Sequence, residues 1–275
     1  MTRSTFRRDD AELSVFDSGV GLPVVFQHGL GGDNGQIVEN FPDGPAYRRL
    51  TVECRAQGQS QPGSVRPFSI AMFAADILAV CDAHGIDRFV MGGISMGAAI
   101  ALHIAHSHPD RVAGLVLARP AWLFDAAPEN MRPYALVAEH LRRDPPEQAK
   151  AAFAASPLAR ELAVDAPDNL ASLLKFFDRP EPSVTADLLG GIALDGPGVT
   201  EAEARALDLP TLVIGHEIDS VHPLAFAKRL AEIIPGARLA EITPKATDKP
   251  RHVTEFRSEL ESFLRTIKPL REKTA

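Results

Sequence analysis

The segment from Asp87 to Ala101 constrains the fold of this chain more than any other stretch. Phe89 to Met91 is a short apolar run of the kind that forms a buried strand, and the motif Gly93-Ile94-Ser95-Met96-Gly97 follows it closely. Ala98 to His106 then has the composition of a helix. A strand, an abrupt turn and a helix form the context in which a G-x-S-x-G motif holds a nucleophile. We therefore expect Ser95 to be a nucleophile.

The residues on either side of Ser95 suit such a sharp turn. Glycine at positions 93 and 97 lets neighbouring backbone approach, and Ala98 and Ala99 let the helix pack close to the sheet. Ser95 would then lie at a helix N-terminus, where the helix dipole and free N–H groups favour developing negative charge. The simpler alternative is a glycine-rich turn with an incidental serine. To exclude it, the rest of the chain must supply a base, an acid and an oxyanion hole.

Length and composition fit one large soluble domain. The chain has 275 residues, of which 45% are hydrophobic and 24% charged, and its net charge of −7 argues against nucleic acid as a partner. The two cysteines, Cys54 and Cys81, are too few for a disulfide scaffold, which favours a reduced cytoplasmic setting. The charged start lacks the apolar run of a signal peptide, and no apolar segment is long enough to span a membrane. We expect a cytoplasmic protein that acts on a small molecule.

Strand patterns alternate with helical patterns over most of the chain. The helical patterns cover residues 70–84, 224–234 and a last helix that ends near residue 267. Such alternation with short turns is typical of a parallel sheet covered by helices on both faces. Residues 11–16 alternate weakly and predict an edge strand. The other strand patterns lie at residues 23–27, 49–53, 89–91, 112–118, 209–215 and 238–242.

The alternation is interrupted between about Pro120 and Pro197, where no strand pattern occurs. Prolines separate short helical patterns there, so we interpret residues 121–197 as an inserted helical cap. Residues 1–120 and 198–275 then form the core. The helical patterns lie at residues 129–143, 146–155, 168–177 and 185–194. Five aromatic residues supply much of the apolar face of the cap: Trp122, Phe124, Phe153, Phe176 and Phe177.

Three residues with catalytic chemistry follow predicted strands. Ser95, Asp219 and His252 each come after the carboxyl end of a strand, which is the edge where open parallel sheets bind ligands. We therefore expect them at one rim of the sheet, in the chain order Ser, Asp, His. Two other acids and two other histidines remain alternatives for the acid and the base: Glu217, Asp125, His216 and His222.

These residues and the motifs around them resemble the α/β-hydrolase superfamily, most closely small bacterial carboxylesterases and enol-lactone hydrolases. The resemblance implies an α/β-hydrolase fold with a mostly parallel eight-stranded sheet and an inserted helical cap. It also implies a base after the last strand, where His252 lies. The chain departs from the family pattern at Ala56, where glycine is usual, and at Asp219, which follows Gly215 by four residues instead of three. The matching motifs are Phe26–Gly32, Arg55–Ser60, Gly93–Gly97 and Pro210–Gly215, with Asp219 and His252.

The resemblance implies acyl transfer without a cofactor or a metal. Ser95 would attack an acyl carbon, His252 would take its proton, and Asp219 would orient the imidazole. The backbone N–H groups of Leu30 and Met96 would bind the oxyanion. The candidate substrate-binding residues are His28 and Gly29 of the glycine-rich loop, with Arg119 and Trp122 at the entrance to the cap.

Two further groups of side chains have competing interpretations. The guanidinium of Arg119 can pair with a substrate carboxylate, or it can form a structural salt bridge with an acid of the cap. His103, His106 and His108 are spaced for metal binding, but no carboxylate or cysteine completes a ligand set. We interpret these three histidines as solvated side chains at a helix end.

The sequence leaves the substrate open. We expect a carboxylesterase or a lactonase, although the same triad also serves thioesterases, carbon–carbon bond hydrolases and perhydrolases. A hydrolase-like receptor would keep all three residues but turn its ligand over slowly. A degenerate scaffold that binds a protein partner would not need an intact nucleophile, base and acid. The sequence also leaves a homodimer open.

Overall fold

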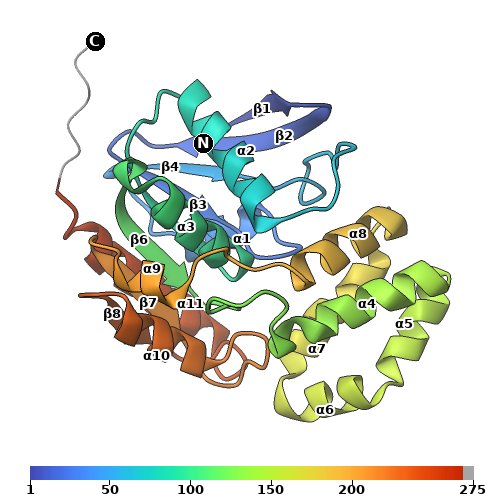
Figure 1. Cartoon of the computed structure of the whole chain (residues 1–275). Coiled ribbons are helices and arrows are strands. Elements are labelled where there is room, and N and C mark those ends of the chain that lie inside the picture. Colours follow the sequence, from blue (N-terminus) through green and yellow to red (C-terminus); the bar gives the residue numbers. More distant parts are fainter. Residues whose placement is uncertain (269–275) are drawn as a thin grey trace.

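One sheet of eight strands runs through the molecule (Figure 1). The structure is a computed structural model that describes residues 1–268. The strands lie in the order β1-β2-β4-β3-β5-β6-β7-β8, and every neighbouring pair from β4 to β8 is parallel. The expected mostly parallel eight-stranded sheet is therefore confirmed. The strands are β1 Thr2–Arg8, β2 Ala11–Ser18, β3 Leu22–Gln27, β4 Tyr47–Val52, β5 Phe89–Ile94, β6 Val112–Ala118, β7 Thr211–Gly215 and β8 Arg238–Glu241.

The edge of the sheet differs from the prediction. β2, expected as the edge strand, pairs on both sides, with β1 and with β4, and both pairings are antiparallel. β1 forms the edge and has no counterpart among the predicted strands. Its residues are mostly exposed and polar, so it lacks the apolar alternation that marks a half-buried strand.

Helices cover both faces of the sheet. α2 and α3 pack with α10 in the larger apolar core, and α1 and α11 pack together on the other face. No helix within residues 1–268 is both long and apolar enough to cross a membrane. The core helices are α1 Asn34–Asn40, α2 Ile70–Ala83, α3 Met96–Ser107, α9 Glu201–Arg205, α10 Leu224–Ile233 and α11 Lys249–Leu264.

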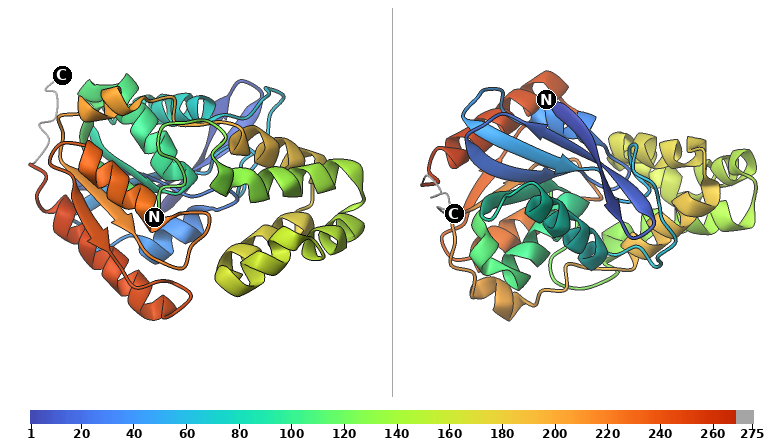
Figure 2. Two further views of the ribbon diagram at one scale, coloured as in Figure 1. Left: turned by 60° about the horizontal axis from the view of Figure 1, so that its bottom comes forward. Right: turned by 90° about the horizontal axis from the view of Figure 1, so that it is seen from above.

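The chain between β6 and β7 forms a group of helices that projects from one end of the sheet (Figure 2). We refer to residues 121–197 as the cap segment. α4 packs along α8, and its buried side chains join the larger core. Short helices that the sequence pattern misses, such as α6, are held by local caps like that of the Ser156 hydroxyl. The cap helices are α4 Arg132–Arg143, α5 Pro146–Ala154, α6 Pro157–Asp165, α7 Pro167–Leu174 and α8 Pro182–Ala193.

The turn from β5 to α3 is packed so tightly that two glycines are required. A Cβ on Gly93 would lie 2.5 Å from the carbonyl carbon of Gly97, and a Cβ on Gly97 would lie 2.4 Å from the carbonyl oxygen of Gln27. Both contacts involve backbone atoms, which cannot rotate away. The motif therefore fixes how closely α3 approaches the sheet.

We predict that Gly97→Ala destabilises the protein, because the added methyl group must push α3 away from β3. The expected loss in the free energy of unfolding is about 1–3 kcal/mol, as for other overpacked interiors. Urea unfolding of the variant and the wild type measures it. An unchanged free energy of unfolding would contradict the packing described for this turn.

Candidate active site

Ser95 occupies the sharp turn between β5 and α3. Its φ of 58° and ψ of −113° form a backbone conformation that is costly for a residue with a Cβ. The amide of Ser95 donates to the Ala118 carbonyl at 2.9 Å, which holds the turn against the end of β6. Ser95 is 7% exposed and lines a cavity of about 110 Å³, which we call the nucleophile cavity. The turn therefore presents the hydroxyl to this cavity.

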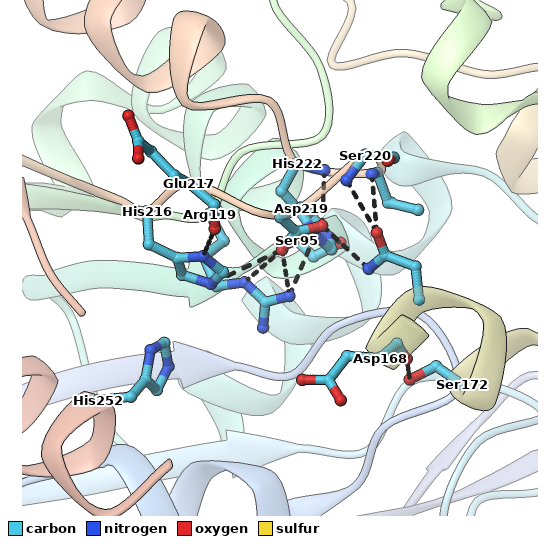
Figure 3. A network of polar contacts seen from close by, with 12 residues as sticks. Ser95, Arg119, Asp168, Ser172, His216, Glu217, Asp219, Ser220, His222 and His252 are labelled. Atoms are coloured by element: carbon cyan, nitrogen blue, oxygen red, sulfur yellow. Dashed lines mark hydrogen bonds and ion pairs between the residues drawn. The ribbon is translucent and has the colours of Figure 1, made fainter. Parts of the chain in front are cut away.

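His222 lies between Ser95 and Asp219 (Figure 3). Its Nε2 is 2.7 Å from Ser95 Oγ, and its Nδ1 is 2.9 Å from each carboxylate oxygen of Asp219. A carboxylate only accepts hydrogen bonds, so Nδ1 carries the proton and Nε2 accepts from the serine hydroxyl. This is the arrangement of a nucleophile, a base and an orienting acid.

The acid and the base come from one short loop between β7 and α10. Asp219 Oδ1 accepts a hydrogen bond from the backbone N–H of His222 at 3.1 Å, so the carboxylate folds the loop around itself. Ile218 has a φ of 59°, which turns the chain just before the acid. Pro223 then ends the loop at the start of α10. The spacing of three residues therefore brings both side chains to the same point.

His252, the base expected from the sequence, lies outside this arrangement (Figure 3). It is in the first turn of α11, and its Nδ1 donates to the Thr243 carbonyl at 2.9 Å. Its ring packs edge-on against His216, with ring centroids 5.0 Å apart. Within residues 1–268, no hydrogen bond joins His252 to Ser95 or to Asp219.

His222, and not His252, lies next to Ser95. The positions of the two histidines in the sequence explain this difference. The loop that follows β8, residues 243–248, contains no histidine. His252 lies beyond that loop, inside a helix, where its ring faces back toward the end of β8. A histidine three residues after the acid is the signal that would have identified His222. The alternatives for the acid, Glu217 and Asp125, are exposed.

Arg119 forms an ion pair with Asp219, which differs from both interpretations of the sequence. Its Nη2 is 2.6 Å and its Nε 3.1 Å from Asp219 Oδ2, and Nη2 also lies 3.2 Å from His222 Nδ1. The pair is largely buried, with side-chain exposures of 16% for Arg119 and 2% for Asp219. The acid partner is thus in the loop after β7 and not in the cap.

These charges set the protonation states of the loop. Burial alone would raise the pKa of Asp219, but His222 and Arg119 outweigh it and hold that pKa well below its usual value. Burial lowers the pKa of His222; Asp219 raises it and Arg119 lowers it again, and the result is a pKa below the usual value. His222 is therefore neutral at pH 7, which is the form that accepts a proton.

Two asparagines from the cap segment hold the same loop. Asn169 of α7 donates from Nδ2 to Asp219 Oδ1 at 3.0 Å, and its Oδ1 accepts from the amides of Ser220 at 2.9 Å and Val221 at 3.3 Å. Asn130 Nδ2 donates to the Val221 carbonyl at 2.7 Å. The cap segment therefore helps to position the acid as well as covering the cavity.

The glycine-rich loop after β3 forms another wall of the nucleophile cavity, through Gly29 and Leu30. The amide of Gly29 donates to Gln36 Oε1 at 2.8 Å, and the amide of Gly31 donates to Gln57 Oε1 at 2.7 Å. The turn and loop hydrogen bonds within residues 1–268 do not engage the Leu30 amide between them. The loop is thus fixed on both sides of an amide that is available to an oxyanion.

Two of the expected substrate contacts lie away from the cavity. His28 is fully buried; its Nδ1 donates to the Gly29 carbonyl, and its Nε2 accepts from the Cys54 amide. Trp122 is 2% exposed and donates from Nε1 to the Asp195 carbonyl. Both side chains therefore have structural roles. No group of three histidine, cysteine, aspartate or glutamate side chains within the described chain is arranged to hold a metal ion.

The nucleophile cavity is small. Its volume of about 110 Å³ is less than the roughly 150 Å³ of an engineered cavity that binds benzene. Its wall opposite the sheet includes Tyr134, Asp168 and Asn169 of the cap segment. In this arrangement the cavity has room for a short acyl group.

The fold is that of an α/β-fold hydrolase. The family model of the alpha/beta hydrolase fold matches residues 23–244, and the chain belongs to that family.

Two known proteins of similar sequence are named as hydrolases of different substrates. The RutD protein of Klebsiella pneumoniae (strain 342), provisionally assigned as a carbamate hydrolase, is 28% identical over 233 residues, which cover 81% of this chain and 83% of that protein. The 2-hydroxymuconate semialdehyde hydrolase of Pseudomonas putida is 28% identical over 247 residues, which cover 82% of this chain and 80% of that protein. The solved structure of an enol-lactonase from Burkholderia xenovorans LB400 has the same fold, with a TM-score of 0.70 and 23% identity over 95% of this chain and 100% of that one.

We predict that Asn169→Ala lowers kcat, because the variant loses a donor to Asp219 and leaves the Ser220 and Val221 amides without their acceptor. The expected decrease is about 10–100-fold, the effect of one to three kcal/mol of lost positioning. Turnover of an activated ester measures it. Gln148→Ala, which removes an exposed cap amide, is the control. Equal turnover by both variants would contradict the positioning role.

We predict that Arg119→Met moves the acidic limb of the pH–rate profile to higher pH. In the wild type we expect the limb below the usual histidine pKa, because burial and Arg119 lower the pKa of His222. Removing the cation favours the imidazolium, so His222 becomes protonated at a higher pH and the base is lost earlier as pH falls. The pH dependence of kcat/KM checks this, with Arg119→Lys as the charge-conserving control. A shift to lower pH would contradict it.

Proposed function

We propose that this protein is a serine hydrolase that cleaves an ester-type bond of a small molecule through an acyl-enzyme. One observation carries the proposal. Ser95 Oγ, the His222 ring and the Asp219 carboxylate form a continuous series of contacts of 2.7 and 2.9 Å at the edge of the nucleophile cavity. Ser95 and His222 are both less than a tenth exposed, and nothing structural requires all three groups to meet there.

In the proposed reaction, Ser95 attacks the acyl carbon while His222 Nε2 takes the hydroxyl proton. Asp219 holds the proton on Nδ1 and stabilises the imidazolium that forms. The imidazolium then returns its proton to the leaving group, and the alcohol departs. A water molecule activated by His222 hydrolyses the acyl-enzyme and regenerates Ser95.

The oxyanion of the tetrahedral intermediate would bind to the backbone N–H groups of Leu30 and Met96. Leu30 lies in the loop fixed by Gln36 and Gln57, and Met96 is the first residue of α3. The N-terminus of α3 adds a favourable dipole for negative charge. Preorganised donors of this kind typically contribute about 10²–10³ in rate each.

A carboxylic ester or a lactone is the substrate class that we propose first, because the small cavity suits a short acyl group. A carbon–carbon bond hydrolase on the same residues is the second candidate, since the Pseudomonas relative hydrolyses 2-hydroxymuconate semialdehyde according to its name. A panel of esters, lactones, thioesters, carbamates and vinylogous diketones separates these classes.

Intact-mass labelling with a fluorophosphonate tests the proposal. We predict a single adduct on the wild type and none on Ser95→Ala, because only an activated serine hydroxyl attacks the phosphorus. His222→Ala should slow labelling by about 10²–10⁴, the usual contribution of a general base. His252→Ala should slow labelling much less than His222→Ala does, because His252 forms no hydrogen bond to Ser95 or Asp219 within residues 1–268.

Circular dichroism of each variant serves as the folding control. A folded wild type that forms no adduct would contradict the proposal and favour a receptor on the same fold. Slow labelling of His252→Ala together with normal labelling of His222→Ala would return the base to His252.

A further inference from the structure

One side of the Arg119 guanidinium lines the nucleophile cavity and is not paired with a carboxylate of the described chain. Asp219 occupies only the Nε and Nη2 groups of the guanidinium. Within residues 1–268, Nη1 makes no hydrogen bond, and Arg119 lines both the nucleophile cavity and a smaller one of about 30 Å³ beside it. In Figure 3 one guanidinium nitrogen of Arg119 points into the space between His252 and Asp168. Two N–H donors on a fixed cation are thus directed at this space.

Lys245 supplies a second cation at the same place. It lies in the loop after β8, is half-buried, and lines the same two cavities as Arg119. The described part of the chain gives its ammonium no hydrogen bond and no ion pair. Burial lowers the pKa of Lys245, and the charge of Arg119 lowers it further. The two cations that line this cavity repel each other, and an anion bound between them would reduce that repulsion.

The other charged groups around this space are already paired or lie at its outer side. Lys249 forms an ion pair with Glu39 at 2.5 Å beside the smaller cavity. Asp168 of α7 is exposed, lines the nucleophile cavity and reaches no cation within ion-pair distance in residues 1–268. Its charge opposes anion binding but is partly screened by solvent.

We infer that the substrate carries a carboxylate, which binds between Arg119 Nη1 and Lys245 Nζ while its ester carbonyl meets Ser95. This inference rests on the proposed function and names its substrate class. The nucleophile and both cations line one cavity of about 110 Å³, so one small substrate bound there can contact all three. A carboxylate there makes charge-assisted hydrogen bonds to both cations and relieves their mutual repulsion.

A pair of isosteric esters tests the inference. Monomethyl succinate carries the carboxylate, and methyl succinamate replaces it with a neutral amide of nearly the same size. The measured quantity is the ratio of their kcat/KM values, determined by methanol release at pH 7.5. We predict that the wild type favours the anionic ester at least about tenfold, as expected for a hydrogen bond to a charged group.

Two substitutions should change this ratio in opposite directions. Lys245→Met should lower it by about 10–100-fold, because it removes one of the two cations. Asp168→Asn should raise it, because it removes the opposing anion. Lys249→Met is the matched control: it removes a nearby lysine that already has a partner, and it should change the ratio less than Lys245→Met does.

A wild-type ratio near one, or the same ratio in Lys245→Met, would overturn the inference. An equal decrease of the ratio in both lysine variants would also overturn the inference. It would indicate that the overall positive charge of the region favours the anionic ester, and that no defined carboxylate site exists. Each of these results leaves the proposed function standing if Ser95 still forms the fluorophosphonate adduct and methyl succinamate is still cleaved. Loss of the adduct itself would instead refute the proposed function.

Discussion

The buried carboxylate of Asp219 is the group on which the rest of the site depends. Its side chain is 2% exposed, and four donors reach it: the His222 ring, the His222 amide, the Arg119 guanidinium and the Asn169 amide. A buried charge is costly unless it is paired and hydrogen-bonded, and these contacts satisfy both oxygens. They also join the sheet, the loop after β7 and the cap segment at one point, so the position of the cap and the state of the base are physically linked.

Much of this arrangement follows from local sequence. The β5–α3 turn could be predicted because only glycine fits the close backbone contacts at positions 93 and 97. The central strands β5, β6 and β7 could be predicted because they are almost entirely apolar. Asp219 could be placed at the same rim as Ser95, since both follow parallel strands. Leu30 could be placed there for the same reason. These inferences need only short-range patterns and the geometry of a parallel sheet.

The features that the sequence analysis does not predict depend mainly on the directions of individual side chains. The periodicity of apolar residues carries no information about these directions. His252 follows the last strand, as a base of this family should, but a helix turns its ring back toward Thr243. The sequence leaves His222 only as an alternative to His252, because the family places its base after the last strand. A spacing of three residues in a loop closed by an aspartate nevertheless brings His222 and Asp219 together. Asn169 comes from a helix of the cap segment 50 residues away from Asp219 in sequence, a contact that no local pattern predicts. β1 is absent from the prediction because a polar edge strand has no apolar signal.

His222 links Ser95 to Asp219 at the centre of this site, and nitrogen-15 NMR of histidine-labelled protein can detect that link. We expect the His222 ring to carry its proton on Nδ1 at neutral pH, to have a pKa below the usual histidine value, and to change to the other tautomer in Asp219→Asn. His222→Gln assigns the signals, and His252→Gln leaves them in place. A His222 ring that carries its proton on Nε2 in the wild type, or that does not respond to Asp219→Asn, would show that His222 does not link the two residues.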